Sequence, residues 1–206
     1  MPQSSYPLIL TNLADARCVV VGGGAVAERK VAGLLEAAAH PLVISPTLTP
    51  ALTAWHRSGV IAHLPRIYAP DDLDGAALVL AATNDPAVNR RVASDARQRG
   101  MLVNVASDPA AGSFHTVASV RRGDLLLTVS TGGHSPALAA AVRADLAARY
   151  GPEYAAALAA AAALRALPPD TLPAETRRAL VGWLCSDAGL AWLRESGVDV
   201  GPRRFT

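Results

Sequence analysis

Residues 19–30 read VVVGGGAVAERK and decide the fold that we predict for this chain. A valine-rich run, typical of a buried strand, leads directly into three glycines, and apolar residues at helical spacing follow. Gly22, Gly24 and Ala27 match the pattern G-x-G-x-x-A. The first glycine permits a tight turn, the second lets a pyrophosphate approach the backbone, and the alanine allows close packing of helix on sheet. The stretch therefore predicts a strand, a turn and a helix whose free N–H groups face a dinucleotide.

The predicted cofactor contacts continue at the end of the next strand-like run, residues 41–45. We expect Ser45, which ends this run, and Pro46 and Thr47, which follow it, to lie beside the adenosine end of the cofactor. No Asp or Glu stands there for a ribose 2′-hydroxyl and no Arg for a 2′-phosphate, so the turn leaves NAD and NADP open. The candidate cofactor-binding residues are Gly22, Gly23, Gly24, Ala25, Val26, Ser45, Pro46, Thr47, Thr83 and Asn84.

Thr83 and Asn84 belong to the segment AATNDP, which follows the fourth strand-like run. Open α/β sheets gather their ligands at the carboxyl ends of the strands, so both residues are expected to border the cofactor. We interpret Asp85 as an N-cap rather than a catalytic group, because a helical period follows it. The alternative for the whole region is a glycine-rich turn that binds no ligand.

Strand-like and helical patterns alternate through the first half of the chain, which predicts an α/β fold. Apolar runs at residues 17–22, 41–45, 60–64, 77–83 and 101–106 indicate a parallel sheet covered by helices on both faces.

After residue 109 this alternation of strand-like and helical patterns ends. Two apolar runs, residues 114–120 and 124–130, flank the turn-like RRG and predict an antiparallel pair of strands. From Ser135 onward the chain is alanine-rich and helical, and residues 175–197 are predicted as one helical stretch.

The composition narrows the class of protein. Nineteen basic and seventeen acidic residues leave a net charge of +2, which does not predict nucleic-acid binding. No run reaches the roughly 18 apolar residues that cross a bilayer, and the first residues lack the pattern of a signal peptide. Cys18 and Cys185 lie far apart without metal-ligand spacing. We therefore expect a cytoplasmic protein with a small-molecule partner and no membrane.

Several segments together resemble a known family. VVVGGGAVAERK, AATND, NVASDP, SFHTVASV and TVSTGGHSPALAAAVR are similar to the precorrin-2 dehydrogenase and sirohydrochlorin ferrochelatase module of siroheme synthases. The similarity covers roughly residues 6–150, and its motifs GGGxVAxRK and STGGxSPxLA are specific. The alanine-rich tail matches only in being helical.

This resemblance implies an oxidoreductase that converts precorrin-2 to sirohydrochlorin with NAD in siroheme biosynthesis. It also implies a homodimer with three parts: an NAD-binding Rossmann-like domain, residues 1–112; a dimerisation region, residues 113–149; and a helical domain, residues 150–206. We expect the methyltransferase domain fused to some relatives to belong to another polypeptide. Two alternatives stay open: a bifunctional dehydrogenase and ferrochelatase, and a nucleotide-sensing module without catalysis.

The turn NVASDP departs from the family pattern N-V-x-D. The carboxylate to which the resemblance assigns proton transfer and chelation is replaced here by Ser107, and a carboxylate follows at Asp108. Neighbouring side chains of an extended segment face opposite ways, so Asp108 does not simply inherit that geometry. Asp108 is the candidate base, with an Asx turn or cap before Pro109 as the alternative. Ser107 can only orient or relay a proton, which makes ferrochelatase activity doubtful.

The segment STGGHSP, residues 130–136, is the second candidate site for the substrate. Its glycines expose N–H groups before a helix that begins at Pro136, and such an N-terminus favours the carboxylates of a tetrapyrrole. Ser135 is also a plain N-cap candidate. His134 is a further candidate for proton transfer, and no histidine has metal-site spacing. The candidate catalytic residues are Asp108, Ser107 and His134, and the candidate substrate-binding residues are Asn104, His115, Ser130, Thr131, Gly132, Gly133 and Ser135.

Overall fold

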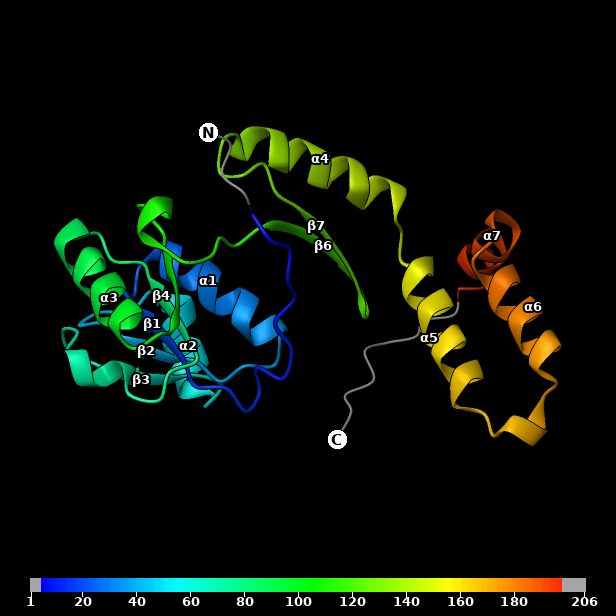
Figure 1. Cartoon of the computed structure of the whole chain (residues 1–206), viewed down its shortest axis with the longest axis horizontal. Coiled ribbons are helices and arrows are strands. Elements are labelled where there is room, and N and C mark those ends of the chain that lie inside the picture. The colour runs from blue at the N-terminus through cyan, green and yellow to red at the C-terminus, as the bar shows by residue number, and fades with distance from the viewer. Residues whose placement is uncertain (1–4, 198–206) are drawn as a thin grey trace. The chain divides into compact units, whose positions relative to one another are not determined.

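The computed structural model of the chain describes residues 5–197 and divides into two compact units, residues 1–116 and 117–206 (Figure 1). Residues 1–4 and 198–206, which our three-part division assigned to its first and third domains, lie outside the described residues. The domain boundaries near residues 112 and 149 stay a prediction.

The first unit is built on five short strands that are all parallel. They are β1 (Cys18–Val21), β2 (Leu42–Ile44), β3 (Ala62–Leu64), β4 (Leu78–Ala81) and β5 (Leu102–Val105). Their order in the sheet is β3-β2-β1-β4-β5, with Val21 paired to Ile44 on one side and to Ala81 on the other. The order reverses direction beside β1, and such a point is where open α/β sheets bind their ligands.

Helices cover both faces of this sheet (Figure 1). The helices are α1 (Ala25–Glu36), α2 (Pro50–Arg57) and α3 (Pro86–Gln98), with the short 3₁₀ turns η1 (Pro70–Leu73) and η2 (Pro109–Ala111). Side chains of a strand alternate between faces, so Val20 packs with α1 and α2, whereas Val19 and Val21 pack with α3 and η1. The predicted α/β, Rossmann-like fold is thereby confirmed.

Polar side chains begin two of these helices. The Thr49 hydroxyl accepts a hydrogen bond of 3.2 Å from Leu52 N at the start of α2. Asp85 caps α3, and its Oδ1 accepts a hydrogen bond of 2.7 Å from Ala87 N. The cap satisfies N–H groups that the helix itself leaves free, as predicted for Asp85. This carboxylate therefore has a structural role.

The second unit contains a hairpin and four helices. The hairpin pairs β6 (Ala118–Arg122) with β7 (Leu125–Val129) in antiparallel orientation, as the sequence predicted. The helices are α4 (Pro136–Arg149), α5 (Glu153–Ala166), α6 (Ala174–Leu184) and α7 (Asp187–Ser196), and the 3₁₀ turn η3 (Pro169–Thr171) joins α5 to α6. The small core that holds α5, α6 and α7 together contains Ala156, Ala157, Leu184, Leu190 and Leu193.

The prediction of one helical stretch over residues 175–197 was wrong, because two helices occupy it. The helical path is interrupted at Ser186. The hydroxyl of Ser186 accepts a hydrogen bond of 3.2 Å from Gly189 N and caps the start of α7. Gly189 lies so close to the end of α6 that a Cβ there would come within 2.1 Å of the Trp183 carbonyl oxygen. A serine and a glycine therefore allow the tight reversal that periodicity alone did not indicate.

Candidate cofactor site

The first glycine of the turn after β1 is required by its backbone conformation. Gly22 has φ of +123°, a region that side chains rarely enter. A Cβ at this position would also lie 2.4 Å from the carbonyl oxygen of Ala82, the residue that follows β4. The amide of Gly22 donates a hydrogen bond of 2.9 Å to Ile44 O, so the turn is held between β2 and β4.

The middle glycine has a role that the motif did not predict. A Cβ at Gly23 would lie 2.0 Å from the carbonyl oxygen of Thr47 and 2.7 Å from the hydroxyl of Ser45. The Gly23 carbonyl in turn accepts a hydrogen bond of 3.0 Å from Thr49 N. Glycine is therefore needed here because the loop after β2 packs directly on the turn, a contact between residues far apart in sequence.

The third glycine faces open space. Gly24 is the N-cap of α1, no side chain caps this helix, and a Cβ at Gly24 would meet nothing within 4 Å. Ala25 and Val26, in the first turn, are exposed. The first N–H groups of a helix have no partner within the helix and carry partial positive charge. The start of α1 is therefore suited to a pyrophosphate.

A cavity of about 640 Å³ opens beside this turn, at the carboxyl ends of β1, β2, β3 and β4. Eight of the ten predicted cofactor-binding residues line it: Gly22, Gly23, Gly24, Ser45, Pro46, Thr47, Thr83 and Asn84. Ala25 and Val26 are not among its lining residues. The hydroxyl of Ser45 donates to Thr47 O at 2.7 Å and so shapes the loop between them. The cavity has the size and position of a cofactor site.

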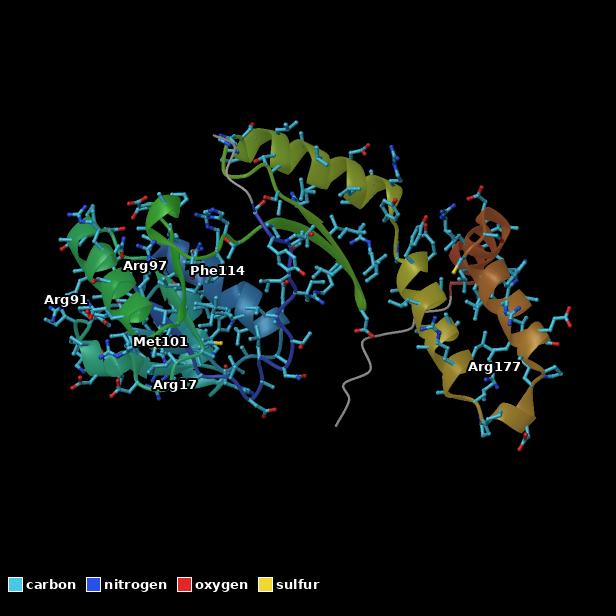
Figure 2. All side chains as sticks on the ribbon, viewed as in Figure 1. Arg17, Arg91, Arg97, Met101, Phe114 and Arg177 are labelled. Carbon is cyan, nitrogen blue, oxygen red and sulfur yellow. The ribbon has the colours of Figure 1, made fainter. Side chains whose placement is uncertain are left out.

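Sequence reasoning missed the lining residues that come from β3 and α3. Arg66 and Tyr68 follow β3, and Val88 and Arg91 lie on α3 (Arg91 is labelled in Figure 2). The run at 60–64 predicted a strand but carried no cofactor motif, so only the order of the strands brings its end to the cavity. The sheet topology, rather than a motif, positions these four residues.

The arginine at the β3 side of the cavity is held by a carboxylate. Arg66 donates two hydrogen bonds to Asp72, of 2.9 and 2.5 Å, and Asp72 is buried. The hydrogen bond from Arg66 holds the pKa of Asp72 below its ordinary value. Tyr68 donates a hydrogen bond of 2.8 Å to Asp95, and burial together with this bond raises the pKa of Tyr68, which stays protonated. These ion-pair and hydrogen-bond contacts fix the outer wall of the cavity.

A family model described as "Putative NAD(P)-binding" matches residues 9–118, more than half of the chain. The chain belongs to this NAD(P)-binding family. The match covers the whole sheet, the glycine turn and the cavity, and it confirms the prediction of a nicotinamide dinucleotide as cofactor.

Curated relatives confirm the predicted resemblance to siroheme synthases. A siroheme synthase of Chromobacterium violaceum is 45% identical over 141 residues, which are 68% of this chain and 30% of that protein. One of Methylobacillus flagellatus is 44% identical over 135 residues, 66% of this chain and 29% of that protein. The chain thus spans about three tenths of the length of these relatives.

A solved structure is similar over both units. It is titled "SirC, precorrin-2 dehydrogenase", and it superposes with a TM-score of 0.78 at 27% sequence identity. The match covers 93% of this chain and 96% of that chain, so the helical region after the NAD(P)-binding family match has a counterpart there. No helix within residues 5–197 is both long enough and apolar enough to span a membrane.

The turn after β5 places Ser107 against the NAD(P)-binding unit. The Asn89 side chain, almost fully buried on α3, donates to the Ser107 hydroxyl at 3.1 Å and to Thr83 O at 3.0 Å. Asn89 Oδ1 also accepts from Thr83 Oγ1 at 2.8 Å. One buried amide therefore joins the loop after β4 to the loop after β5, beside the cavity.

Asp108 is exposed, and its carboxylate is free of the turn. Asp108 precedes η2, where its backbone carbonyl accepts a hydrogen bond of 3.1 Å from Ala111 N, but its side chain makes no capping bond. The capping alternative therefore applies to its backbone only. The carboxylate is open to solvent and is therefore accessible to a ligand that approaches this turn.

Asn104, predicted to bind substrate, is already engaged within the protein. This residue of β5 is buried, its Oδ1 accepts a hydrogen bond of 2.6 Å from the Lys30 ammonium, and its Nδ2 donates to Phe114 O at 2.9 Å. His115, two residues before the second unit begins, is exposed. Lys30 was not among the predicted site residues, although it is the last residue of the motif GGGxVAxRK.

The remaining candidates belong to the second unit. Ser135 caps α4, and its hydroxyl accepts a hydrogen bond of 3.2 Å from Leu138 N. The hydroxyl of Thr131 accepts from Ser135 N at 3.2 Å, and that of Ser130 accepts from Gly132 N at 3.2 Å. Gly132 and Gly133 have positive φ, and His134 is exposed. Within residues 5–197, no three His, Cys, Asp or Glu side chains cluster as metal ligands would.

Proposed function

We propose that the chain is an NAD-dependent precorrin-2 dehydrogenase, which oxidises precorrin-2 to sirohydrochlorin. The observation that carries the proposal is the similarity to a precorrin-2 dehydrogenase over nearly the full length of both chains. A dinucleotide cavity in the first unit and the siroheme synthase relatives support it independently.

The residues of the first unit fit the cofactor. Gly24 leaves room for a pyrophosphate, and the start of α1 offers N–H groups that no side chain caps. Residues after β2 and β3 line the part of the cavity on the adenosine side, so the nicotinamide belongs near the ends of β4 and β5. NAD, when bound, accepts a hydride from the substrate.

The chain itself must then accept a proton, because removing a hydride and a proton together balances the two-electron oxidation. We assign this step to the Asp108 carboxylate, which is exposed beside the end of β5 and free of capping bonds. Ser107, whose hydroxyl accepts from Asn89, orients the turn that presents Asp108. We leave iron insertion out of the proposal, since Ser107 brings no carboxylate to the position that the resemblance links to chelation.

The proposal includes a homodimer that works in the cytoplasm. No residue of α4 is buried, and Leu138 and Val142, one turn apart on this helix, are 55% and 37% exposed. An apolar stripe of this kind is suited to contact with a second copy. Cys185 is an exposed free thiol, which fits a reducing compartment. We assign substrate contacts to His115, His134 and the segment 130–135.

The test is a direct assay. Purified protein is incubated with anaerobically prepared precorrin-2 and NAD, and NADH absorbance and the sirohydrochlorin spectrum are followed together. We expect both signals to rise in step, and a protein that binds NAD but produces neither signal would refute the proposal in favour of a sensing module. Ferrous iron added to sirohydrochlorin tests chelation separately.

A variant tests the base. Asp108→Ala should slow turnover about tenfold or more, a barrier increase of ~1.4 kcal/mol, because no carboxylate then accepts the proton. The Kd for NAD should stay unchanged, and it is measured by calorimetry. Asp124→Ala removes another exposed carboxylate, in the turn between β6 and β7, and serves as the matched control. Equal turnover in Asp108→Ala and wild type would remove Asp108 from the mechanism.

A further inference from the structure

Lys30 stands apart from the cofactor cavity, on the second turn of α1. Its ammonium donates a hydrogen bond of 2.6 Å to Asn104 Oδ1 and lies 3.4 Å from the Thr116 hydroxyl. The three residues come from α1, from β5 and from the segment that follows η2. They form a polar cluster, which we call the Lys30 cluster, at a place where three separate parts of the first unit meet.

The ammonium of this cluster has neutral partners only. Lys30 is partly buried, and no carboxylate within residues 5–197 lies within 4 Å of its Nζ, since the salt bridges of this range all involve arginine. Burial, and to a lesser extent the nearby Arg29, lowers the pKa of Lys30. A partly buried cation without a counter-charge is costly, and its cost falls when an anion binds.

At least one N–H group of the Lys30 ammonium has no acceptor within the cluster. A lysine ammonium carries three N–H groups, and the two oxygens of Asn104 and Thr116 use at most two of them. Asn104 is itself held from the other side, because its Nδ2 donates to Phe114 O (Phe114 is labelled in Figure 2). The Asn104 amide therefore presents its oxygen to Lys30 in a fixed orientation, and the ammonium is positioned in advance of any ligand.

Its location is the edge of the sheet where ligands gather. Asn104 is the third of the four residues of β5, near its carboxyl end, and Ser107 and Asp108 follow that end directly. Side chains of a helix tilt toward its N-terminus, so the Lys30 side chain leans toward the start of α1. Lys30 does not line the adenosine cavity, which is formed by the loops after β1 to β4. Lys30 instead lies beside β5, the strand after which we placed the proposed proton acceptor, Asp108.

We infer that Lys30 binds a carboxylate of the substrate and that Asn104 positions its ammonium for this contact. The inference rests on the proposed function, because precorrin-2 carries acetate and propionate side chains and NAD carries no carboxylate. Lys30 is thus a substrate-binding residue, and Asn104 acts through Lys30 rather than by contacting the substrate. The competing role is a structural link that joins α1 to β5 and involves no ligand.

Steady-state kinetics with precorrin-2 separate these roles. Lys30→Gln keeps a hydrogen-bond donor near Asn104 but removes the charge, and it should raise KM for precorrin-2 about tenfold while kcat changes less than about threefold. Lys30→Arg, which keeps the charge, should recover most of the lost affinity. Arg29→Gln removes the neighbouring exposed cation and should leave KM unchanged. Calorimetry with NAD should give one Kd for all four proteins.

A KM for Lys30→Gln equal to that of wild type would overturn the inference. If that unchanged KM came with a loss of thermal stability that Lys30→Arg does not recover, the structural link would be the role of Lys30. If Lys30→Gln does not fold, Asn104→Asp provides the second variant, since a carboxylate 2.6 Å away would neutralise the ammonium in place. It should raise KM as Lys30→Gln does, and an unchanged KM again counts against the inference. Wild-type protein without turnover would refute the proposed function itself, whereas wild-type turnover with unaltered KM in the variants would refute only the role of Lys30.

Discussion

The two units of the chain bury their apolar residues to very different degrees. In the first unit, the central strands β1 and β4 are buried at every position, and both faces of the sheet have a continuous core. In the second unit, the hairpin buries only Val120 among its strand residues, and α4 buries none. Apolar area removed from water is the main source of stability. The central strands of the first unit are therefore fully covered, whereas the hairpin and α4 of the second unit leave every residue except Val120 at least partly exposed.

The largest expected effect concerns the turn that makes the first unit a cofactor site. Gly23→Val would place side-chain atoms on the carbonyl of Thr47, so the loops after β1 and β2 must separate. We expect the Kd for NAD to rise on the order of 100-fold, or ~2.7 kcal/mol, measured by calorimetry. The thermal transition of the first unit should fall, and that of the second should not.

Gly24→Ala is the matched control for this variant. A methyl group at Gly24 meets no protein atom within 4 Å, so the fold should keep its stability while the approach of the pyrophosphate is impeded. Gly23 and Gly24 thus separate folding from binding. Equal loss of stability in the two variants would contradict the assignment.

A smaller effect is expected in the core of the second unit. Leu193→Ala truncates a side chain that is 6% exposed between α5, α6 and α7, and it should reduce the free energy of unfolding by about 2–4 kcal/mol. The Kd for NAD should not change, because the cofactor cavity lies wholly in the first unit. Denaturant unfolding followed by circular dichroism measures the loss. Leu180→Ala, at a 40% exposed position of α6, should cost much less.

The smallest effect is a response to acid that both units share. Hydrogen bonds from Arg66 and Arg194 lower the pKa values of Asp72 and Glu153 below their ordinary 3.8 and 4.5. At a pH above these ordinary pKa values, each ionised carboxylate therefore stabilises its unit. This contribution is lost as the pH falls through the lowered pKa values of the folded state. We expect melting temperatures to fall by a few degrees between pH 5 and pH 3.

Two substitutions divide this response between the units. Asp72→Asn should remove the acid sensitivity contributed by the first unit, and Glu153→Gln that contributed by the second, as differential scanning calorimetry at both pH values would reveal. An identical pH response in wild type and both variants would show that other groups dominate.

Sequence patterns predicted the parts of the molecule that depend on neighbours along the chain. The strand, turn and helix of residues 19–30 and the cap at Asp85 rest on local rules, and the structure confirms them. The need for glycine at Gly23, the place of Arg66 in the cavity and the contact of Lys30 with Asn104 depend on loops that only the sheet order brings together. Such contacts have no local signature, so sequence reasoning missed them.

The buried amide of Asn89 has a consequence for how this site can change over time. Its Nδ2 donates a hydrogen bond of 3.1 Å to the Ser107 hydroxyl, and a carboxylate at this position would also offer an acceptor. A Ser107→Asp substitution would therefore keep an acceptor for this buried amide. The chemical group offered at this edge of the sheet can thus change at one position that lies outside the lining of the dinucleotide cavity.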